Sequence, residues 1–529
     1  MIRTQLHHLL QDSAGIHGSR PALTYKDETC SYQDLWRTVQ SVARGLIGSG
    51  LERGDRVAIL LDKRIETVAA IFGTSAAGGV FVPINPLLRP AQVGYILGNC
   101  DVRVLVTSPE RLTQLTDELG ARPSVELVIV VGGGQSSAAA GTVPGVRVRS
   151  WDEEFTSDGL GEIDRDGIDL DIAAILYTSG STGKPKGVVL SHRNLIVGAE
   201  SVSQYLANTA EDVILSALPL SFDAGFSQLT TAFGVGAHVV LMNYLLPADV
   251  VRLCARHGVT GLTCVPPLWI QIADLAWPPE AAATLRYFAN TGGRMPKSTL
   301  DKLRGHFPQA APFLMYGLTE AFRSTYLDPA EVDRRPDSIG KAIPNAEILV
   351  VRPDGTECDP GEEGELVHRG ALVSLGYWND PDRTAERFRP VPGRERDASW
   401  RAPELAVWSG DGVTRDEDGF LYFVGRTDEM IKTSGYRVSP TEIEEVAFAS
   451  GLVRDAVALG MDDAKLGQRV LLVASPVAGQ DLDTKELLAV MRRQLPLYML
   501  PSTVVVRPEL PRSPNGKFDR VRLREEIGQ

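Results

Sequence analysis

The chain has 529 residues, which is too long for a single hydrophobic core, so at least two domains are expected. Its composition, 43% hydrophobic and 23% charged, is that of an ordinary globular protein, and its formal net charge is −13. Because nucleic acid and anionic lipid attract positively charged proteins, this charge argues against both as main partners.

Cysteine usage and the start of the chain bear on the compartment. The five cysteines are scattered without any C-x-x-C spacing, which argues against a structural zinc site or a disulfide framework. The first residues, M-I-R-T-Q-L-H-H-L-L-Q-D, lack the apolar run of a signal peptide, and no apolar stretch long enough to span a bilayer follows. We therefore expect no membrane segment and a cytoplasmic location.

Residues 1–130 alternate between helix-like and strand-like patterns. The segment 31–46 places its apolar residues at helical spacing behind Ser31, a residue type that caps helices. Residues 56–61 (R-V-A-I-L-L) and 102–107 (V-R-V-L-V-T) are short β-rich runs. Strands that alternate with helices predict parallel sheets flanked by helices, an α/β fold.

The stretch 176–192, L-Y-T-S-G-S-T-G-K-P-K-G-V-V-L-S-H, begins at the end of a predicted buried strand over 172–178. Its glycines let the backbone approach an anion, its hydroxyl groups donate hydrogen bonds, and its lysines add positive charge. These features favour a polyphosphate ligand over a flexible linker, because linkers rarely combine a buried strand before, an apolar run after and so many donors. A P-loop is excluded, since Thr178 stands where that motif needs glycine and Pro185 where it needs Ser or Thr. The candidate phosphate-binding residues are Thr178, Ser179, Gly180, Ser181, Thr182, Gly183, Lys184 and Lys186.

The last hundred residues show a different pattern. After F-L-Y-F-V-G-R-T-D-E-M at 420–430 come an amphipathic helical pattern, S-P-T-E-I-E-E-V-A-F-A, and alternating segments such as R-V-L-L-V-A-S-P-V. We place a domain boundary near Asp428. Two irregular tracts, 132–145 and 390–405, are predicted to be surface loops, with contact to a partner as the alternative for the second.

Five motifs in fixed order resemble one known family. Y-T-S-G-S-T-G-K-P-K-G looks like the phosphate-loop signature of the adenylate-forming superfamily, which includes acyl-CoA synthetases, nonribosomal-peptide adenylation domains and luciferases. The remaining signatures follow in the family's order: Y-G-L-T-E at 316–320, W-S-G-D-G at 408–412, G-R-T-D-E-M-I-K-T-S-G-Y-R-V-S-P-T-E-I-E at 425–444 and P-N-G-K at 514–517. M-Y-G-L-T-E-A-F-R-S-T-Y-L and A-V-W-S-G-D look most like stand-alone ligases, namely exosortase-associated acyl-CoA ligases and free-standing prolyl-type adenylating enzymes.

The resemblance implies both a fold and a reaction. The fold is α/β, with a large N-terminal AMP-binding domain of helix-flanked β-sheets plus a β-subdomain over 1–427, and a small mobile α+β domain over 428–529. The reaction uses ATP and Mg²⁺: a carboxylate attacks the α-phosphate, pyrophosphate leaves, and the acyl group then passes to a thiol. Because the carboxylate is already ionised near neutral pH, the site needs positioning and positive charge rather than a general base.

The family's roles can be carried over residue by residue. The loop from Ser179 to Lys186 would hold the β- and γ-phosphates. Thr319 and Glu320 would serve the α-phosphate and the Mg²⁺, and Lys517 would bridge the attacking carboxylate and the α-phosphate. Tyr316 and Gly317 would lie against adenine, next to the backbone at Gly292. Asp411 would accept hydrogen bonds from both ribose hydroxyls, and Arg426 would contact the ribose or a phosphate. Taken alone, Glu320, Asp411 and Lys517 are as well explained by solvated turn or tail positions, and the ordered motifs reverse that preference.

For the second step, the resemblance implies that the small domain rotates about Asp428. Gly435 would then lie beside an incoming pantetheine arm, with Lys432 and Arg437 in the same loop; an ordinary turn glycine is the alternative. The acceptor would be CoA or a phosphopantetheinyl carrier protein. No D-S-L-type attachment segment follows residue 520, so we expect a carrier to be a separate protein.

The sequence predicts the identity of the acid substrate less firmly than the reaction. L-P-L-S-F-D-A-G-F at 218–226 matches the family's substrate-pocket segment, and Asp223 stands where amino-acid-activating members pair with the α-amino group. A buried carboxylate needs a cation or several donors, so an amino-bearing acid is the preferred prediction. The alternative is an internal pair with Arg323, which would admit a plain aliphatic or aromatic acid. The other predicted wall residues, mostly apolar and mixed in size, favour a small or medium acid: Phe222, Ser227, Cys264, Trp269, Ala289, Thr291, Met315 and Ser324.

Two other functions stay open. An adenylating enzyme with a different final step would oxidise the activated acid or pass it to an amine, and thiol-dependent AMP release separates it from a thiol ligase. A nucleotide-binding protein without catalysis is the third hypothesis. The presence of Glu320, Asp411, Arg426 and Lys517 argues against that third hypothesis.

Overall fold

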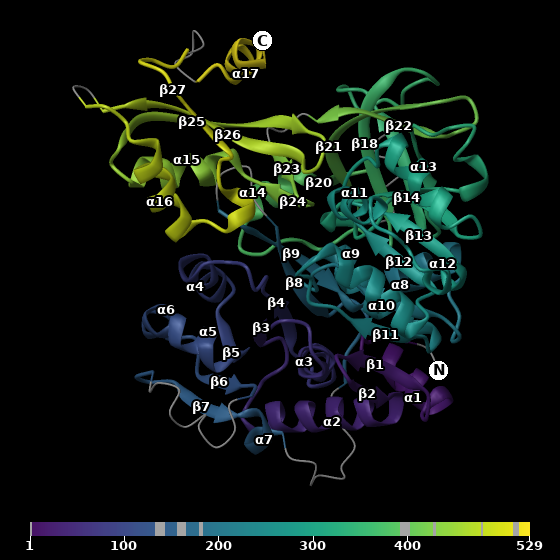
Figure 1. Cartoon of the computed structure of the whole chain (residues 1–529). Coiled ribbons are helices and arrows are strands. Elements are labelled where there is room, and N and C mark those ends of the chain that lie inside the picture. The colour runs from purple at the N-terminus through teal and green to yellow at the C-terminus, as the bar shows by residue number, and fades with distance from the viewer. Residues whose placement is uncertain are drawn as a thin grey trace.

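A computed structural model describes most of the chain. The described residues are 3–132, 143–155, 166–178, 184–391, 403–426, 430–477, 480–511 and 518–528. Within them, three β-sheets and the helices that cover them make up the architecture (Figure 1). The predicted loop at 390–405 falls largely outside these ranges, as does most of the tract 132–145.

The first sheet has eight strands in the order β19-β9-β8-β4-β3-β5-β6-β7. All neighbours from β8 to β7 are parallel, whereas β9 runs antiparallel to β8. The strands predicted at 56–61 and 102–107 are confirmed as β3 and β5. The bounds are β3 Arg56–Leu60, β4 Val80–Pro83, β5 Val102–Thr107, β6 Leu127–Val130, β7 Arg147–Ser150, β8 Ile172–Thr178, β9 Lys186–Ser191 and β19 Gly376–Tyr377.

The second sheet joins a parallel half to an antiparallel half. The parallel strands run in the order β14-β13-β12-β10-β11-β1, and β15, β16, β22, β21, β18 and β17 continue the sheet in antiparallel pairs. This is the predicted combination of helix-flanked sheets with a β-subdomain. The bounds are β1 Pro21–Tyr25, β2 Glu28–Ser31, β10 Val213–Ser216, β11 His238–Leu241, β12 Gly261–Cys264, β13 Tyr287–Asn290, β14 Ala311–Tyr316, β15 Thr325–Leu327, β16 Ser338–Ala342, β17 Ala346–Val351, β18 Glu363–Gly370, β20 Phe388–Pro390, β21 Leu405–Arg415 and β22 Leu421–Arg426.

Helices cover both sheets. The helix predicted behind Ser31 is α2 (Tyr32–Gly48), and the Ser31 hydroxyl accepts a hydrogen bond from the Asp34 backbone N–H, a cap of about 1 kcal/mol. Its apolar face, Leu35 to Leu46, is buried against the core. The other helices here are α1 His8–His17, α3 Ile65–Ala76, α4 Pro90–Asn99, α5 Pro109–Gln114, α6 Thr116–Gly120, α7 Trp151–Glu154, α8 His192–Leu206, α9 Asp223–Val235, α10 Pro247–His257, α11 Pro266–Ala273, α12 Pro279–Thr284, α13 Lys297–His306 and α14 Pro381–Arg387, with short turns η2 Thr319–Ala321 and η3 Pro329–Glu331.

The C-terminal part forms the third sheet, β24-β23-β26-β25 with β27 beside β26. The amphipathic pattern after Ser439 is confirmed as a helix, α15, and Ser439 caps it. Asp428 lies outside the described residues, so the boundary between 427 and 428 stays a prediction. The bounds are β23 Ile431–Thr433, β24 Tyr436–Val438, β25 Val453–Asp463, β26 Gly467–Pro476, β27 Thr503–Val506, α15 Pro440–Ala449, α16 Thr484–Gln494, η4 Leu497–Met499 and α17 Arg520–Gly528.

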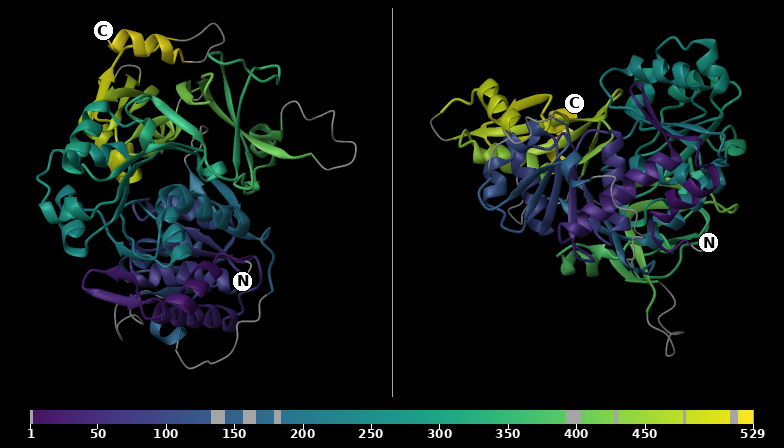
Figure 2. Two further views of the ribbon diagram at one scale, coloured as in Figure 1. Left: turned by 90° about the vertical axis from the view of Figure 1, so that its right-hand side faces the viewer. Right: turned by 90° about the horizontal axis from the view of Figure 1, so that it is seen from below.

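The third sheet rests against the N-terminal part (Figure 2). The Arg89 guanidinium, at the start of α4, donates hydrogen bonds to the backbone carbonyls of Leu495 at 3.3 Å and Arg492 at 2.9 Å. The rings of Phe222 and Tyr436 meet edge to face, 5.3 Å apart. The first contacts join the end of α16 to α4, and the second places the β23–β24 hairpin against the segment before α9.

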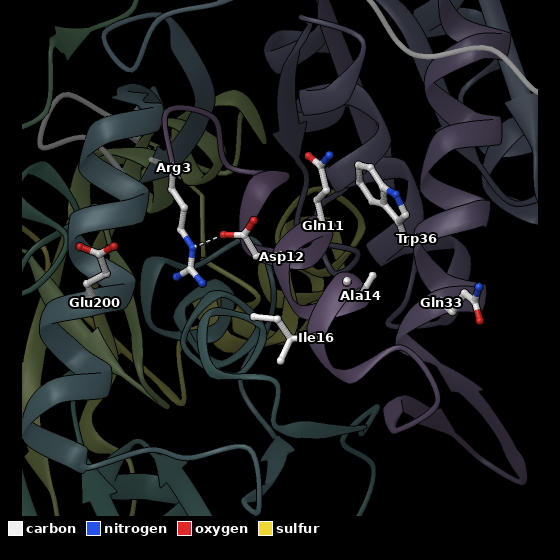
Figure 3. A pocket seen from close by; sticks show the side chains of 9 residues that line it. Arg3, Gln11, Asp12, Ala14, Ile16, Gln33, Trp36 and Glu200 are labelled. Carbon is white, nitrogen blue, oxygen red and sulfur yellow. Dashed lines mark hydrogen bonds and ion pairs between the residues drawn. The ribbon is translucent and has the colours of Figure 1, made fainter. Parts of the chain in front are cut away.

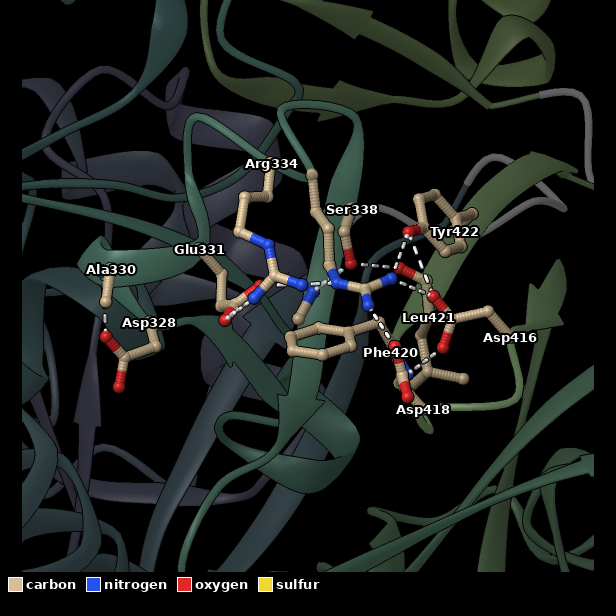
Figure 4. A network of polar contacts seen from close by, with 12 residues as sticks. Asp328, Ala330, Glu331, Arg334, Ser338, Asp416, Asp418, Phe420, Leu421 and Tyr422 are labelled. Atoms are coloured by element: carbon tan, nitrogen blue, oxygen red, sulfur yellow. Dashed lines mark hydrogen bonds and ion pairs between the residues drawn. The ribbon is translucent and has the colours of Figure 1, made fainter.

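Arg335 anchors the β21–β22 hairpin through polar contacts with Glu331, Asp416, Asp418 and Tyr422, four residues that Figure 4 labels. Its guanidinium forms ion pairs with Glu331, Asp416 and Asp418 and lies 4.2 Å above the Phe420 ring. Because β21 also carries Asp411, this network holds the strand that presents the predicted ribose ligand. No helix in the described ranges is long and apolar enough to cross a bilayer.

Candidate active site

A cavity of 200 Å³ lies at the carboxyl ends of the parallel strands of the second sheet. Segments that follow β10, β12, β13 and β14 line it, as do the end of β8 and the β23–β24 hairpin. Ligand sites in open α/β sheets occupy this edge, because the loops that leave adjacent parallel strands converge there. Thirteen of the predicted site residues line this cavity: Thr178, Phe222, Asp223, Thr291, Gly292, Tyr316, Gly317, Thr319, Glu320, Arg323, Lys432, Gly435 and Arg437.

Lys186, Glu320 and Tyr377 form a compact polar cluster beside the cavity. The Lys186 ammonium donates to Glu320 Oε1 at 3.1 Å and to the Tyr377 hydroxyl at 2.6 Å, and that hydroxyl donates to the same Oε1 at 2.6 Å. Glu320 is 2% exposed, and its Oε2 receives no hydrogen bond from any described residue. The carboxylate therefore keeps one oxygen for a further ligand.

The cluster is electrostatically positive. Burial raises the pKa of Glu320, but the charges of Lys186, Arg387 and Arg437 outweigh burial and hold that pKa well below its usual value. Burial lowers the pKa of Lys186, and the Glu320 charge opposes this shift. Positive charge that surrounds a single ionised carboxylate suits the binding of phosphates.

The predicted nucleotide contacts assemble around Tyr316, at the end of β14. Its hydroxyl donates a hydrogen bond to the carboxylate of Asp411, a residue on β21 that is 1% exposed. Arg426 is the backbone neighbour of Asp411 across the β21–β22 ladder. Gly292 has φ +76°, a left-handed conformation that lets the backbone turn tightly after β13.

Three of the predicted phosphate-loop residues lie within the described part of the chain. Thr178 ends β8, and its hydroxyl is buried with no hydrogen-bond partner among the described residues. Lys184 is exposed, with its ammonium 5.9 Å from the Tyr95 ring, and Lys186 begins β9. Ser179, Gly180, Ser181, Thr182 and Gly183 lie outside the described residues.

Asp223 and Arg323 meet in the part of the cavity predicted for the acid. The nearest atoms of their ion pair, Arg323 Nη1 and Asp223 Oδ2, are 3.9 Å apart, beyond hydrogen-bonding distance. Burial raises the pKa of Asp223, and the Arg323 charge opposes this shift. Thr319 donates a long hydrogen bond, 3.4 Å, to Asp223 Oδ1. The internal pair considered from the sequence exists, but it is loose.

A second cavity of 20 Å³ lies behind the first, and Arg323 lines both. Ser227 and Met315 line the small cavity. The predicted wall positions of Cys264, Trp269 and Ser324 need correction, because none of them lines either cavity. Cys264 and Trp269 are fully buried in an apolar core cluster, and the Ser324 hydroxyl is hydrogen-bonded to the buried His368. Ala289 is likewise a core residue.

The C-terminal hairpin completes the cavity. Lys432, Gly435 and Arg437 all line it, so the described arrangement places the predicted thiol-step loop at the site. Gly435 has φ +80°, and a Cβ there would approach Val265 Cγ2 at 2.8 Å. Val265 has a stiff, branched side chain that cannot easily move away. Asp428 and Lys517 lie outside the described residues.

Gly435→Ala is expected to slow transfer to a thiol about tenfold or more, because the added Cβ prevents the hairpin from packing against Val265. Pyrophosphate release without a thiol is expected to change by less than about threefold. Measuring AMP and pyrophosphate separately, with and without thiol, checks this. Gly451→Ala is the matched control, because Gly451 has φ +70° but open space around its Cβ. Equal losses in both half-reactions would contradict the assignment.

Glu442 lies where α15 meets the N-terminal part. Gln92 Nε2 donates to its Oε1 at 2.6 Å, its Oε2 is buried without a partner among the described residues, and burial raises its pKa to about 7. A raised pKa favours the docked state while Glu442 is protonated. We therefore expect docking of the C-terminal part to weaken as pH rises from about 4.5 towards 7.

Glu442→Gln is expected to keep the Gln92 hydrogen bond and remove that pH dependence. The protease sensitivity of the C-terminal part, followed between pH 5 and 8, measures it. Glu486→Gln, at an exposed position of α16, serves as the control because its charge does not contribute to the pKa shift of Glu442. An unchanged profile in Glu442→Gln would show that another group titrates.

Sequence reasoning missed Tyr377 and Glu442. Tyr377 stands in G-Y-W-N-D-P and reaches Glu320 only because the two-residue strand β19 pairs with β9. In the sequence, Glu442 resembles an ordinary charged residue on the polar face of an amphipathic helix. Neither position carries a local signal, since its partners come from distant parts of the chain.

A wider surface hollow of 1110 Å³ lies elsewhere, between α1, α2 and α8 (Figure 3). Arg3, paired with Asp12, and Trp36 line it. None of the predicted site residues does, so the larger volume is not the candidate site.

Comparisons with known proteins match both parts of the chain to family models. The model of the AMP-binding enzyme family matches residues 10–378, and that of the AMP-binding enzyme C-terminal domain matches residues 442–517. The chain is 33% identical to the L-proline–[L-prolyl-carrier protein] ligase of Streptomyces coelicolor, over 97% of this chain and 95% of that protein.

Two further matches are a longer protein that contains a similar segment and a solved structure of similar length. Tyrocidine synthase 1 of Brevibacillus parabrevis is 28% identical over 98% of this chain, which spans only 45% of that protein's length. The solved o-succinylbenzoate CoA synthetase of Bacillus subtilis, bound with a product analogue, superposes with a TM-score of 0.83 at 25% identity, covering 99% of this chain and 98% of that one.

Proposed function

Because the chain belongs to the AMP-binding enzyme family, we propose that it uses ATP to activate a small carboxylic acid as an acyl adenylate and then transfers the acyl group to a thiol. The observation that carries the proposal is the cavity in which Glu320 and Tyr316 meet Asp223 and Arg323, with Lys186 hydrogen-bonded to Glu320 beside it. A phosphate-binding side thus faces a second set of polar groups suited to an acid.

In the first step, a carboxylate oxygen bonds to the α-phosphorus while the bond to the β-phosphate oxygen breaks and pyrophosphate leaves. The acid enters ionised, so no protein base is needed. Lys186 and the residues of the 178–186 loop neutralise phosphate charge, Tyr316 and Asp411 hold the nucleoside, and Thr319 contacts the α-phosphate. Lys517 is proposed to bridge the attacking oxygen and the α-phosphate as charge builds.

The residues present fit a magnesium ion. Mg²⁺ prefers oxygen ligands and commonly takes only one or two protein carboxylates together with substrate phosphates and water. Glu320 supplies an ionised carboxylate with an available oxygen, Oε2, next to the phosphate side of the cavity. When bound there, Mg²⁺ would neutralise charge on the phosphates.

The acid is proposed to be small and to carry an amino group. The main cavity of 200 Å³ supports a small acid. Asp223 supports the amine, because the one cation paired with it among the described residues is 3.9 Å away and an ammonium would give it a close partner. The competing proposal is a plain acid, with the Asp223–Arg323 pair left as it stands.

The acceptor is proposed to be CoA or a separate phosphopantetheinyl carrier protein, with a small acid as the other substrate. The names of two relatives support the two options, one a carrier-protein ligase and one a CoA synthetase. Lys432, Gly435 and Arg437 line the same cavity as Glu320, which supports entry of a thiol beside the hairpin. We also propose that residues 428–529 rotate as a unit about Asp428 between the two steps.

An acid-dependent screen tests the proposal. Pyrophosphate release is measured over free amino acids and simple organic acids, with and without CoA. Turnover that CoA increases supports a CoA ligase, whereas turnover without a CoA effect points to a carrier protein or an amine acceptor. Failure of every acid to release pyrophosphate would overturn the proposal.

A further inference from the structure

Arg323 is the most deeply buried charged group at the acid end of the cavity. Its side chain is 3% exposed, and it lines both the main cavity and the 20 Å³ cavity behind it. It follows directly after Phe322, whose φ of +57° is rare for an aromatic residue. A strained turn thus holds the guanidinium at this point.

The guanidinium makes few of the hydrogen bonds that it is able to make. Of its five N–H donors, one on Nη1 reaches Thr291 Oγ1 at 2.9 Å. Among the described residues, the buried Nε has no hydrogen-bond partner and Nη2 has no acceptor. Asp223, at 3.9 Å, is too distant for a hydrogen bond. Buried donors without acceptors are costly, so the site is incomplete as it stands.

Most neighbouring polar groups are already occupied. Gln228 Oε1 accepts from the Leu218 N–H, and its Nε2 donates to the Leu215 carbonyl. The Thr231 hydroxyl donates to the Ser227 carbonyl. Asn208 Oδ1 is the one buried acceptor of the small cavity, among the described residues, that lacks a partner, and it makes no hydrogen bond to Arg323. No described side chain that lines the small cavity accepts a hydrogen bond from Arg323, which leaves a ligand or water to supply the acceptors.

We propose that Arg323 binds a second oxygen acceptor of the acid, distinct from the reacting carboxylate: a carboxylate, an amide carbonyl or a hydroxyl group. The inference rests on the proposed function, because it assumes that the acid occupies this cavity. It is compatible with an amine on Asp223, since the two neighbouring side chains then bind two different polar groups of one substrate. Purely hydrocarbon acids of the same shape would leave the guanidinium unsatisfied.

Matched pairs of acids test this directly. Glutamate, glutamine and homoserine are compared with norvaline and norleucine, and glutarate and 5-hydroxypentanoate with hexanoate, so that oxygen content is varied with and without an amine. The oxygen-bearing member of each active pair is expected to exceed its hydrocarbon partner roughly 10- to 100-fold in kcat/KM, the effect of a hydrogen bond to a charged group. Equal or better use of the hydrocarbon acids would overturn the inference and indicate that water fills the small cavity instead.

Two variants separate this inference from the proposed function. Arg323→Met is expected to abolish the preference for oxygen-bearing acids, Arg323→Lys to keep part of it, and Arg37→Met, on the exposed face of α2, to leave it unchanged. The shift in melting temperature caused by each acid is measured alongside turnover. Oxygen-bearing acids that stabilise the wild type but not Arg323→Met, without any pyrophosphate release, would support the inference and overturn the proposed function. If Arg323→Met kept both turnover and the preference for oxygen-bearing acids, the inference would be overturned and the proposed function would be supported.

Discussion

Glu320→Gln is expected to reduce acid-dependent pyrophosphate release by roughly 100- to 1,000-fold, the usual cost of removing one preorganised electrostatic contact. The change removes the negative charge that holds Lys186 and the oxygen proposed for Mg²⁺. It also leaves Tyr377 without its ionised acceptor. Because glutamine is nearly isosteric, the loss reports on charge more than on packing.

The result has a clear control. Glu211→Gln removes a carboxylate that is 80% exposed and paired with Arg20. Glu211 precedes β10, whereas the cavity lies beyond the other end of that strand, so the rate should be unchanged. The magnesium dependence of ATP binding, followed by a fluorescent ATP analogue, gives a readout apart from turnover. A loss of less than about tenfold, with unaltered magnesium dependence, would remove Glu320 from the proposed role.

Lys517→Ala is expected to have an effect of similar size but on one step only. Its ammonium is proposed to act while the acyl–phosphate bond forms, so pyrophosphate release should fall by roughly 100- to 1,000-fold. Transfer from a chemically prepared acyl adenylate to the thiol should continue at the wild-type rate. Measuring both half-reactions with the same preparation checks this division.

A lysine elsewhere in the C-terminal part provides the comparison. Lys485→Ala, at the exposed start of α16, should affect neither step. Loss of both steps in Lys517→Ala would mean that the residue supports the structure of the C-terminal part. If both steps kept their wild-type rates in Lys517→Ala, Lys517 would be an ordinary solvated lysine without a role in the reaction.

Local patterns predicted the elements well because local forces determine them. Ser31 caps α2 as its residue type suggests, and the apolar runs at β3 and β5 are buried strands of a parallel sheet. The motifs also predicted which segments meet: the 176–192 stretch starts at the end of β8, the 316–320 motif lies at the end of β14, and both reach the cavity. That prediction came from the resemblance to a known family, which implies the roles of the motifs.

Side-chain contacts between distant segments could not be predicted in the same way. Tyr377 reaches Glu320 only through the pairing of β19 with β9, and Glu442 reaches Gln92 only when α15 docks on α4. The opposite error occurred at Cys264 and Trp269, which lie near the cavity in sequence but turn into the core. A wall position inferred from alignment does not determine which way a side chain packs.

The acid end shows why the alternatives stayed open. From the sequence, an Asp223–Arg323 pair and an amine-binding Asp223 excluded each other. The structure places the two groups close enough to interact but too far apart to hydrogen-bond, so each keeps capacity for a ligand. A loose pair of this kind is determined by the strained turn at Phe322, which no residue pattern signals.

The most direct test of the account is to follow the carboxylate oxygen. An active acid labelled with oxygen-18 in its carboxylate is incubated with ATP, Mg²⁺ and thiol, and the nucleotide product is analysed by mass spectrometry. Attack on the α-phosphorus predicts AMP that carries one labelled oxygen, with unlabelled pyrophosphate. Unlabelled AMP, or ADP with the label in inorganic phosphate, would contradict carboxylate adenylation as the reaction of this site.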